Sequence, residues 1–214
     1  MVPPYVVVVP VKPPALGKSR IVGLDHEQRR GLARAFALDT VAACLAADHV
    51  AAVLVATDDA AFSRELGALG CATIPDGDTN DLNAALRQAV AEAQRRWPDH
   101  TPVALCADLP ALRSAELTVA LESVVPGGPS FVADAEGVGT TFYTAPYGEF
   151  DPRFGAHSRA AHLGSGALEL GAGLASLRRD VDDLADLRAA VALGVGPETS
   201  ALVSSLDLTR PDLT

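Results

Sequence analysis

Short apolar runs alternate with longer stretches whose apolar residues recur every three or four positions along most of the chain. The first run, Tyr5 to Val9, is almost entirely valine and predicts a strand buried on both faces. A second run of small and apolar residues, Val103 to Ala107, predicts a strand in the middle of a parallel sheet. The same pattern predicts further strands at 50–57, 71–74, 131–133, 140–144 and 179–182.

Polar residues mark where the expected helices begin. Asp25 and Gln28 have the spacing of a capping box, which predicts a helix that runs to about Ala47. The two aspartates at 58–59 predict a second helix, which ends near Leu69. Further helices are expected at 82–96, 114–123 and 184–193. No regular structure is assigned to 150–166 or to the segment after 194.

The alternation of strands and helices predicts a three-layer α/β fold with a mostly parallel sheet. The chain of 214 residues contains no repeat or obvious linker, so one domain is expected over 1–214. The irregular stretch 130–166 interrupts the alternation and is the expected place for a second substrate.

Composition narrows the classes of partner. A formal net charge of −10 argues against binding to nucleic acid, because phosphate backbones are bound by Lys and Arg. No apolar run approaches the roughly 20 residues that span a bilayer, and the apolar stretch near the start is too short for a signal peptide. A cytoplasmic protein without a membrane partner is therefore expected. The three cysteines have no metal or redox spacing and are expected to be reduced.

Carboxylates at the ends of predicted strands are the first candidate chemistry. Asp108 follows the central strand, at the edge where open α/β sheets bind ligands. It could cap the next helix or hold a metal ion. Asp180 and Asp182 are two residues apart on a predicted strand and would project to one face, although a solvated acidic turn is an alternative. Together the three could form a site for Mg²⁺, which prefers a few carboxylates plus substrate phosphates.

A basic loop follows the first strand. Lys12 and Lys18 are the only lysines in the chain, and Arg20 lies beside them. The loop could be merely solvated, or it could bind a nucleoside triphosphate. The loop departs from the P-loop motif, because Lys12 occupies the position of that motif's first glycine. Asn83 lies in the first turn of a predicted helix, where it could face the nucleotide or simply follow a helix-capping Asp81 or Asn80.

Two glycine-containing segments, 137–141 and 154–158, offer hydroxyls and backbone N–H groups to a second phosphate or carboxylate, although each could be an ordinary turn. The five histidines show no metal-ligand spacing, and no dinucleotide-binding glycine pattern or nucleophile elbow is present.

These segments, in this order, resemble one family: the guanylyltransferases of deazaflavin coenzyme (factor 420) biosynthesis, which act on 2-phospho-L-lactate or phosphoenolpyruvate. The resemblance covers roughly 5–197. It rests on the segments 11–20, 81–85, 108–112, 139–140, 153–158, 164–167 and 180–182.

The resemblance implies a nucleotidyltransferase fold like that of the molybdenum-cofactor guanylyltransferases, and it implies the following roles. Mg²⁺ would be held by Asp108, Asp180 and Asp182. The phosphorylated three-carbon acid would be contacted by Thr140, Gly155 and Ser158. GTP would be faced by Lys12, Lys18, Arg20 and Asn83, with Lys18 and Asp108 acting in catalysis. A downstream transferase that consumes the activated product is an expected partner.

The expected reaction condenses GTP with phosphoenolpyruvate and releases pyrophosphate. A phosphate oxygen is already anionic near neutral pH, so such a nucleophile needs no general base, which fits the absence of a catalytic histidine or serine pattern. The motifs do not decide between phosphoenolpyruvate, which is preferred by resemblance to the actinobacterial branch, and 2-phospho-L-lactate. Another nucleotidyltransferase of the same fold, a non-catalytic nucleotide-binding protein and, more distantly, a P-loop kinase are the alternatives.

Overall fold

The computed structural model describes residues 2–11, 21, 23–77, 81–171 and 173–206. Within these residues, seven strands form one sheet in the order β3-β2-β1-β4-β6-β5-β7. The strands are β1 (Tyr5–Pro10), β2 (Val50–Ala56), β3 (Ala72–Ile74), β4 (Thr101–Leu105), β5 (Ser130–Ala133), β6 (Thr140–Thr144) and β7 (Leu168–Glu169). Among them only β6 runs antiparallel to its neighbours β4 and β5, so the predicted mostly parallel sheet is confirmed.

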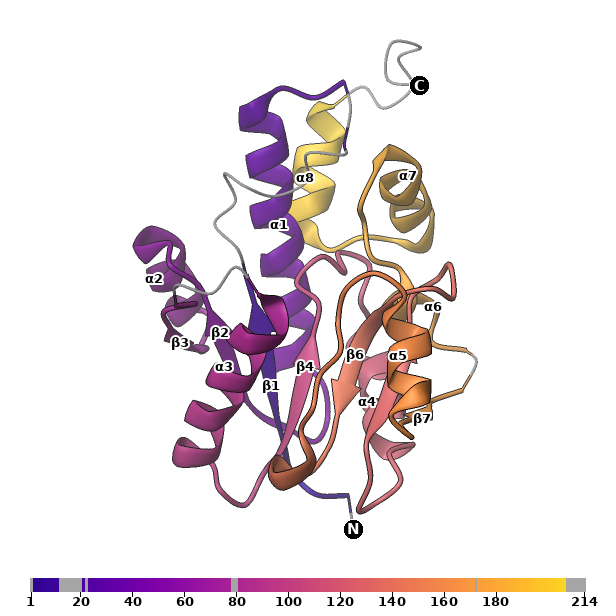
Figure 1. Ribbon diagram of the computed structural model, residues 1–214. Coiled ribbons are helices and arrows are strands. Elements are labelled where there is room, and N and C mark those ends of the chain that lie inside the picture. Colours follow the sequence, from indigo (N-terminus) through magenta and orange to yellow (C-terminus); the bar gives the residue numbers. More distant parts are fainter. Residues whose placement is uncertain (1, 12–20, 22, 78–80, 172, 207–214) are drawn as a thin grey trace.

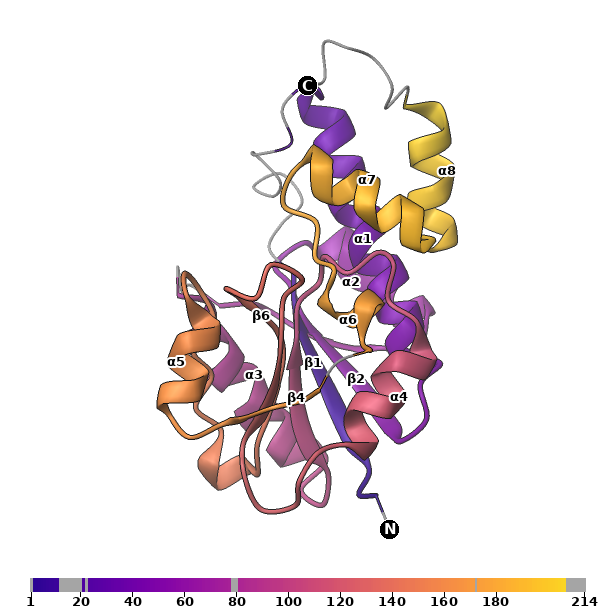
Figure 2. The same ribbon diagram turned by 90° about the vertical axis from the view of Figure 1, so that its right-hand side faces the viewer.

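Helices cover both faces of this sheet, so the predicted three-layer α/β fold is confirmed (Figures 1 and 2). The α-helices are α1 (His26–Leu45), α2 (Ala60–Ala68), α3 (Leu82–Arg96), α4 (Ser114–Glu122), α5 (Ser158–Gly164), α6 (Ala175–Arg178), α7 (Leu184–Leu193) and α8 (Pro197–Ser205). A short 3-10 helix, η2, spans Tyr147–Glu149. None of the helices in the described ranges is long and apolar enough to cross a membrane.

The two faces of the sheet pack into separate apolar cores. On β1, Val7 and Val9 join the core under α1, α2, α4 and α6, whereas Val6 and Val8 join the core under α3. This alternation follows from the two-residue period of a strand, and burial on both faces explains the valine run. Cys44 and Cys71 are buried, Cys106 is half-buried, and none of the three is in a disulfide.

A third core lies beyond the end of the sheet, where α7 and α8 pack beside the first half of α1 (Figure 2). Buried Asp39 of α1 accepts hydrogen bonds from the backbone N–H groups of Glu198 and Thr199 at the start of α8, at 3.1 and 2.8 Å. The Gly196 N–H donates to the carbonyl of Pro110. The C-terminal helices thereby brace the loop that follows β4.

Several sequence predictions need correction. Residues 179–182 do not form a strand, since they lie between α6 and α7 and make no ladder. The stretch 150–166, predicted to be irregular, contains α5. The segment after 194 contains α8, and β7 and α6 were not predicted.

Candidate active site

The Asp108 segment begins the candidate site at the carboxyl end of β4. The strand ends at Leu105, so Asp108 lies three residues beyond the ladder rather than directly at its end. Buried Thr40 of α1 holds this segment, because its hydroxyl accepts from the Leu109 N–H at 3.1 Å and lies 3.2 Å from the Ala107 carbonyl. The backbone on both sides of the half-buried Asp108 is therefore tied to α1.

The 180–182 segment meets the Asp108 segment directly. The Val181 N–H donates to the Asp108 carbonyl at 3.1 Å, and the Val181 side chain is buried in the third core. Asp180 is half-buried and Asp182 is exposed, so the valine anchors the segment while its acidic neighbours stay accessible. The structure thus joins the two acidic segments that the sequence singled out, although through one hydrogen bond rather than a strand ladder.

Carboxylates crowd around Asp180. Burial, and then the negative charges of Asp108, Asp182 and Asp134, raise its pKa to about 7. Next to it lies a pocket of about 270 Å³, here called the acidic pocket, which is lined by Asp134, Glu136, Asp180, Asp182, Asp183 and Asp186. Across the described ranges, no three His, Cys, Asp or Glu side chains are already gathered as a metal site.

Asp134 joins this site from the end of β5. Its carboxylate accepts from the N–H groups of Val138 and Gly139, at 2.9 and 2.6 Å. A Cβ at Gly139 would collide with that carboxylate, so the close approach requires glycine. These two N–H groups are consequently taken, which contradicts the expectation that the 137–141 turn offers them to a substrate anion.

The candidate acid-binding residues lie at the same edge because β6 is reversed. Thr140 is its first residue and therefore lies near the last residues of β4 and β5. The Arg159 N–H donates to the Val138 carbonyl at 3.1 Å, which ties the start of α5 to the 137–141 turn. Thr140 Oγ1 lies 3.0 Å from Nδ1 of His162, one helical turn after Ser158. These two contacts link the two segments that sequence analysis assigned to the second substrate. Within the second segment, Gly155 has a φ of +128°.

Asn83 lies at the start of α3, which Asp81 caps through the Asn83 N–H at 2.9 Å. The Asn83 side chain forms two hydrogen bonds with the backbone of Phe154. Its Nδ2 donates to the Phe154 carbonyl at 2.9 Å, and its Oδ1 accepts from the Phe154 N–H at 2.8 Å. This amide therefore holds the segment that contains Gly155. The predicted GTP contacts Lys12, Lys18 and Arg20 lie outside the described residues.

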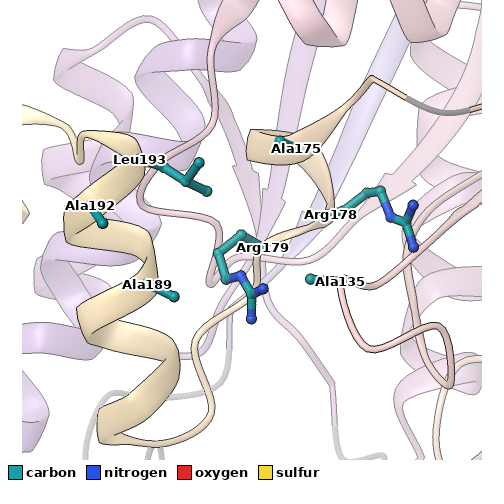
Figure 3. Close-up of a pocket in the computed structure, with 7 residues that line it drawn as sticks. All are labelled: Ala135, Ala175, Arg178, Arg179, Ala189, Ala192 and Leu193. Atoms are coloured by element: carbon teal, nitrogen blue, oxygen red, sulfur yellow. The ribbon is translucent and has the colours of Figure 1, made fainter.

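An open pocket of about 420 Å³ lies beside the acidic pocket, between α6, α7 and the turn after β5 (Figure 3). It is lined by Ala135, Ala175, Arg178, Arg179, Ala189, Ala192 and Leu193. Arg178 donates to the carbonyls of Ala133 and Asp134, and Arg179 pairs with Asp186 at 3.2 Å. Both guanidinium groups therefore hold the frame of the acidic pocket.

Three residues that shape the candidate site were not identified from the sequence. Asp134 follows a predicted strand just as Asp108 does, so the same pattern could have identified it. His162 and Thr40 carry no such signal, because their roles depend on contacts between elements distant in sequence.

The fold and the acidic edge of the sheet define the class of protein. A nucleotidyl transferase from a Methanothermobacter species has a TM-score of 0.57 and 18% identity, covering 88% of this chain and 97% of that one. A cytidylyltransferase from Leptospira borgpetersenii has a TM-score of 0.57 and 10% identity, covering 100% of this chain and 97% of that one. The chain has a nucleotidyltransferase fold, as predicted.

The family follows from sequence. The model of the family described as "Guanylyl transferase CofC like" matches residues 5–172. A phosphoenolpyruvate guanylyltransferase of Thermomonospora curvata is 49% identical over 206 residues, which are 95% of this chain and 90% of that protein. One of Streptomyces coelicolor is 49% identical over 205 residues, covering 94% and 97%. The chain belongs to this family of guanylyltransferases, and the predicted resemblance is confirmed.

Proposed function

We propose that the protein transfers the guanylyl group of GTP to phosphoenolpyruvate, which yields enolpyruvoyl-2-diphospho-5'-guanosine and pyrophosphate. The activity for which the relatives are named supports this assignment. The observation that carries it is the hydrogen bond from Val181 to Asp108, because it joins two acidic segments beside the start of β6. One edge of the sheet then offers both a carboxylate cluster and a candidate anion site.

The proposed donors are carboxylate oxygens, the ligand type that Mg²⁺ prefers, although the side chains of the described residues are not already gathered as a metal site. Burial and the neighbouring carboxylates together raise the pKa of Asp180, and a hard cation would relieve the repulsion between those carboxylates. Asp108, Asp180 and Asp182 would hold the ion, and substrate phosphates would supply the remaining oxygen ligands, as Mg²⁺ sites commonly require. The bound ion would offset negative charge on the phosphates during transfer.

The nucleotide would bind on the side of β1 and α3. Lys12, Lys18 and Arg20 are the proposed contacts to the triphosphate, and Lys18 is the proposed catalytic cation. The Asn83 amide nitrogen carries two hydrogens, of which one is donated to the Phe154 carbonyl, and the second is the proposed donor to the nucleotide. Asn83 would then connect the nucleotide to the acid-binding segment.

The acid would bind at Thr140, Gly155 and Ser158. In the reaction, an oxygen of its phosphate attacks the α-phosphorus of GTP and forms a new P–O bond. The bond from the α-phosphorus to the β-phosphate oxygen breaks, and pyrophosphate leaves with that electron pair. The attacking oxygen carries no proton at neutral pH, so the chain only has to position two anions and reduce their repulsion. A downstream transferase would consume the activated product.

The test is pyrophosphate release from GTP and Mg²⁺ with phosphoenolpyruvate, 2-phospho-L-lactate or a sugar phosphate supplied in turn, with the product identified by mass spectrometry. We expect the highest kcat/KM with phosphoenolpyruvate. A pocket separates the planar and tetrahedral acids by only about 1–3 kcal/mol, so some turnover of phospholactate is expected. A tenfold preference for phospholactate would assign the alternative substrate. No turnover with either acid would refute the proposal.

A further inference from the structure

His162 occupies the centre of the acid-binding region. It lies on α5, is fully buried, and stacks against Tyr143 and Phe131 with ring centroids 4.7 and 5.3 Å away. Phe154 meets its edge at 5.7 Å. An imidazole enclosed by three aromatic rings cannot turn over freely, so the partners of its two nitrogens are fixed.

Those partners determine where the ring carries its proton. The Arg153 N–H donates to Nε2 at 3.0 Å, so Nε2 is the bare nitrogen. The ring proton must therefore be on Nδ1. Burial lowers the pKa of His162 to about 4, so the ring is neutral at physiological pH.

The assignment has a consequence for Thr140. Its Oγ1 lies 3.0 Å from the protonated Nδ1 and thus acts as an acceptor there. The hydroxyl hydrogen of Thr140 must then point away from His162. Among the described residues, His162 is the only side-chain hydrogen-bond partner of the Thr140 hydroxyl. A hydroxyl that accepts from a fixed N–H is oriented to donate its own hydrogen to an anion.

We propose that His162, in its neutral Nδ1–H form, is a positioning residue that orients the Thr140 hydroxyl as a donor to a phosphate or carboxylate oxygen of the acid. Through Nε2 it also holds the backbone of Arg153 at the entry to the segment containing Gly155 and Ser158. The identity of the acid rests on the proposed function, whereas the tautomer of His162 and the orientation of Thr140 do not.

The tautomer is tested first, without activity. Two-bond ¹H–¹⁵N spectra of wild-type protein with ¹⁵N-labelled histidine distinguish Nδ1–H, Nε2–H and imidazolium rings. The His162 signals are assigned by their loss in His162→Gln. We expect an Nδ1–H ring at pH 7 that stays neutral down to about pH 5. An Nε2–H ring or an imidazolium at pH 7 would overturn the proposal.

A matched pair of variants then separates the two nitrogens. The amide N–H of His162→Asn lies near the position of Nδ1, and the amide oxygen of His162→Gln can replace Nε2 as acceptor. We expect His162→Gln to lower kcat/KM for phosphoenolpyruvate about tenfold or more, through KM, with KM for GTP nearly unchanged. His162→Asn should restore a large part of that loss. Restoration by Gln and not by Asn would refute the orientation of Thr140.

Thr140→Val and His49→Asn complete the design. Thr140→Val should match His162→Gln, and the double variant should be no worse than either one, because both remove the same contact. Additive losses would refute the coupling. His49 directly precedes β2 and accepts a hydrogen bond from the Tyr5 N–H at the start of β1, so it lies at the amino-terminal end of these strands, and His49→Asn should leave both KM values unchanged. If the wild type turned over neither acid, the proposed function would fail while the spectra still decided the tautomer.

Discussion

Thr40 offers a quantitative test of how the Asp108 segment is held. Thr40→Val preserves shape but removes the hydroxyl, which accepts from the Leu109 N–H and lies within reach of the carbonyls of Phe36 and Ala107. Thr40 and Leu109 are both fully buried, so water cannot replace the lost acceptor. A buried donor left without a partner costs about 1–3 kcal/mol. For a chain of this length each kcal/mol lowers Tm by roughly 2–4 °C.

We therefore expect Thr40→Val to lower Tm by roughly 2–12 °C in thermal unfolding followed by circular dichroism. Because the freed segment carries Asp108, kcat should fall as well, measured by pyrophosphate release. Thr40→Ser keeps the hydroxyl and serves as the control, with a smaller loss of Tm and near-normal kcat. Equal Tm and kcat in Thr40→Val and wild type, or equal damage by Ser and Val, would refute the reasoning.

Four further predictions concern the site itself. Asp182→Asn should reduce kcat about 100-fold or more while circular dichroism stays unchanged, because Asp182 is exposed and loses only charge; near-normal turnover at limiting Mg²⁺ would contradict this. Ser158→Ala should raise KM for the acid but not for GTP in steady-state assays. Lys18→Ala should weaken the response to GTP by about 1.5–3 kcal/mol, and an effect on the acid alone would reverse the assignment. The pKa of Asp180 rises from 3.8 to about 7 in the folded chain, so without Mg²⁺ the contribution of Asp180 to stability should be lost as pH rises through that window. In thermal melts, added Mg²⁺ should stabilise the fold most above pH 7.

Local patterns predicted the parts of the fold that depend on local chemistry. The caps at Asp25 and Asp59 accept hydrogen bonds from backbone N–H groups two or three residues further along the chain, so sequence spacing alone could identify them. The valine run of β1 could likewise be identified from its composition. Asp108 could be singled out because it follows a predicted strand, and Asp180 because it is two residues from Asp182, although the strand predicted at 179–182 is absent.

The remainder depends on long-range contacts. Pro197 at the first position of α8 and Glu198 in its first turn are local start signals, but the N-terminal N–H groups are satisfied by Asp39, which lies about 160 residues away. The 179–182 segment alternates like a strand because Val181 must be buried, yet a single bond to Asp108 replaces the ladder. The role of His162 requires the fold, because its neighbours come from β5, β6 and the loop before α5.

The reversed strand β6 also bears on how such a protein can change over generations. On one side of it, β1 to β4 form a parallel block whose register is fixed by direct pairing. On the other side, the 134–139 turn and the 145–157 loop are connections that can lengthen without shifting that register. Insertions there would reshape the proposed acid site, and an insertion that moved Phe154 would also disturb its two hydrogen bonds to Asn83 of α3. Relatives that accept bulkier acids are therefore expected to differ in these two connections first.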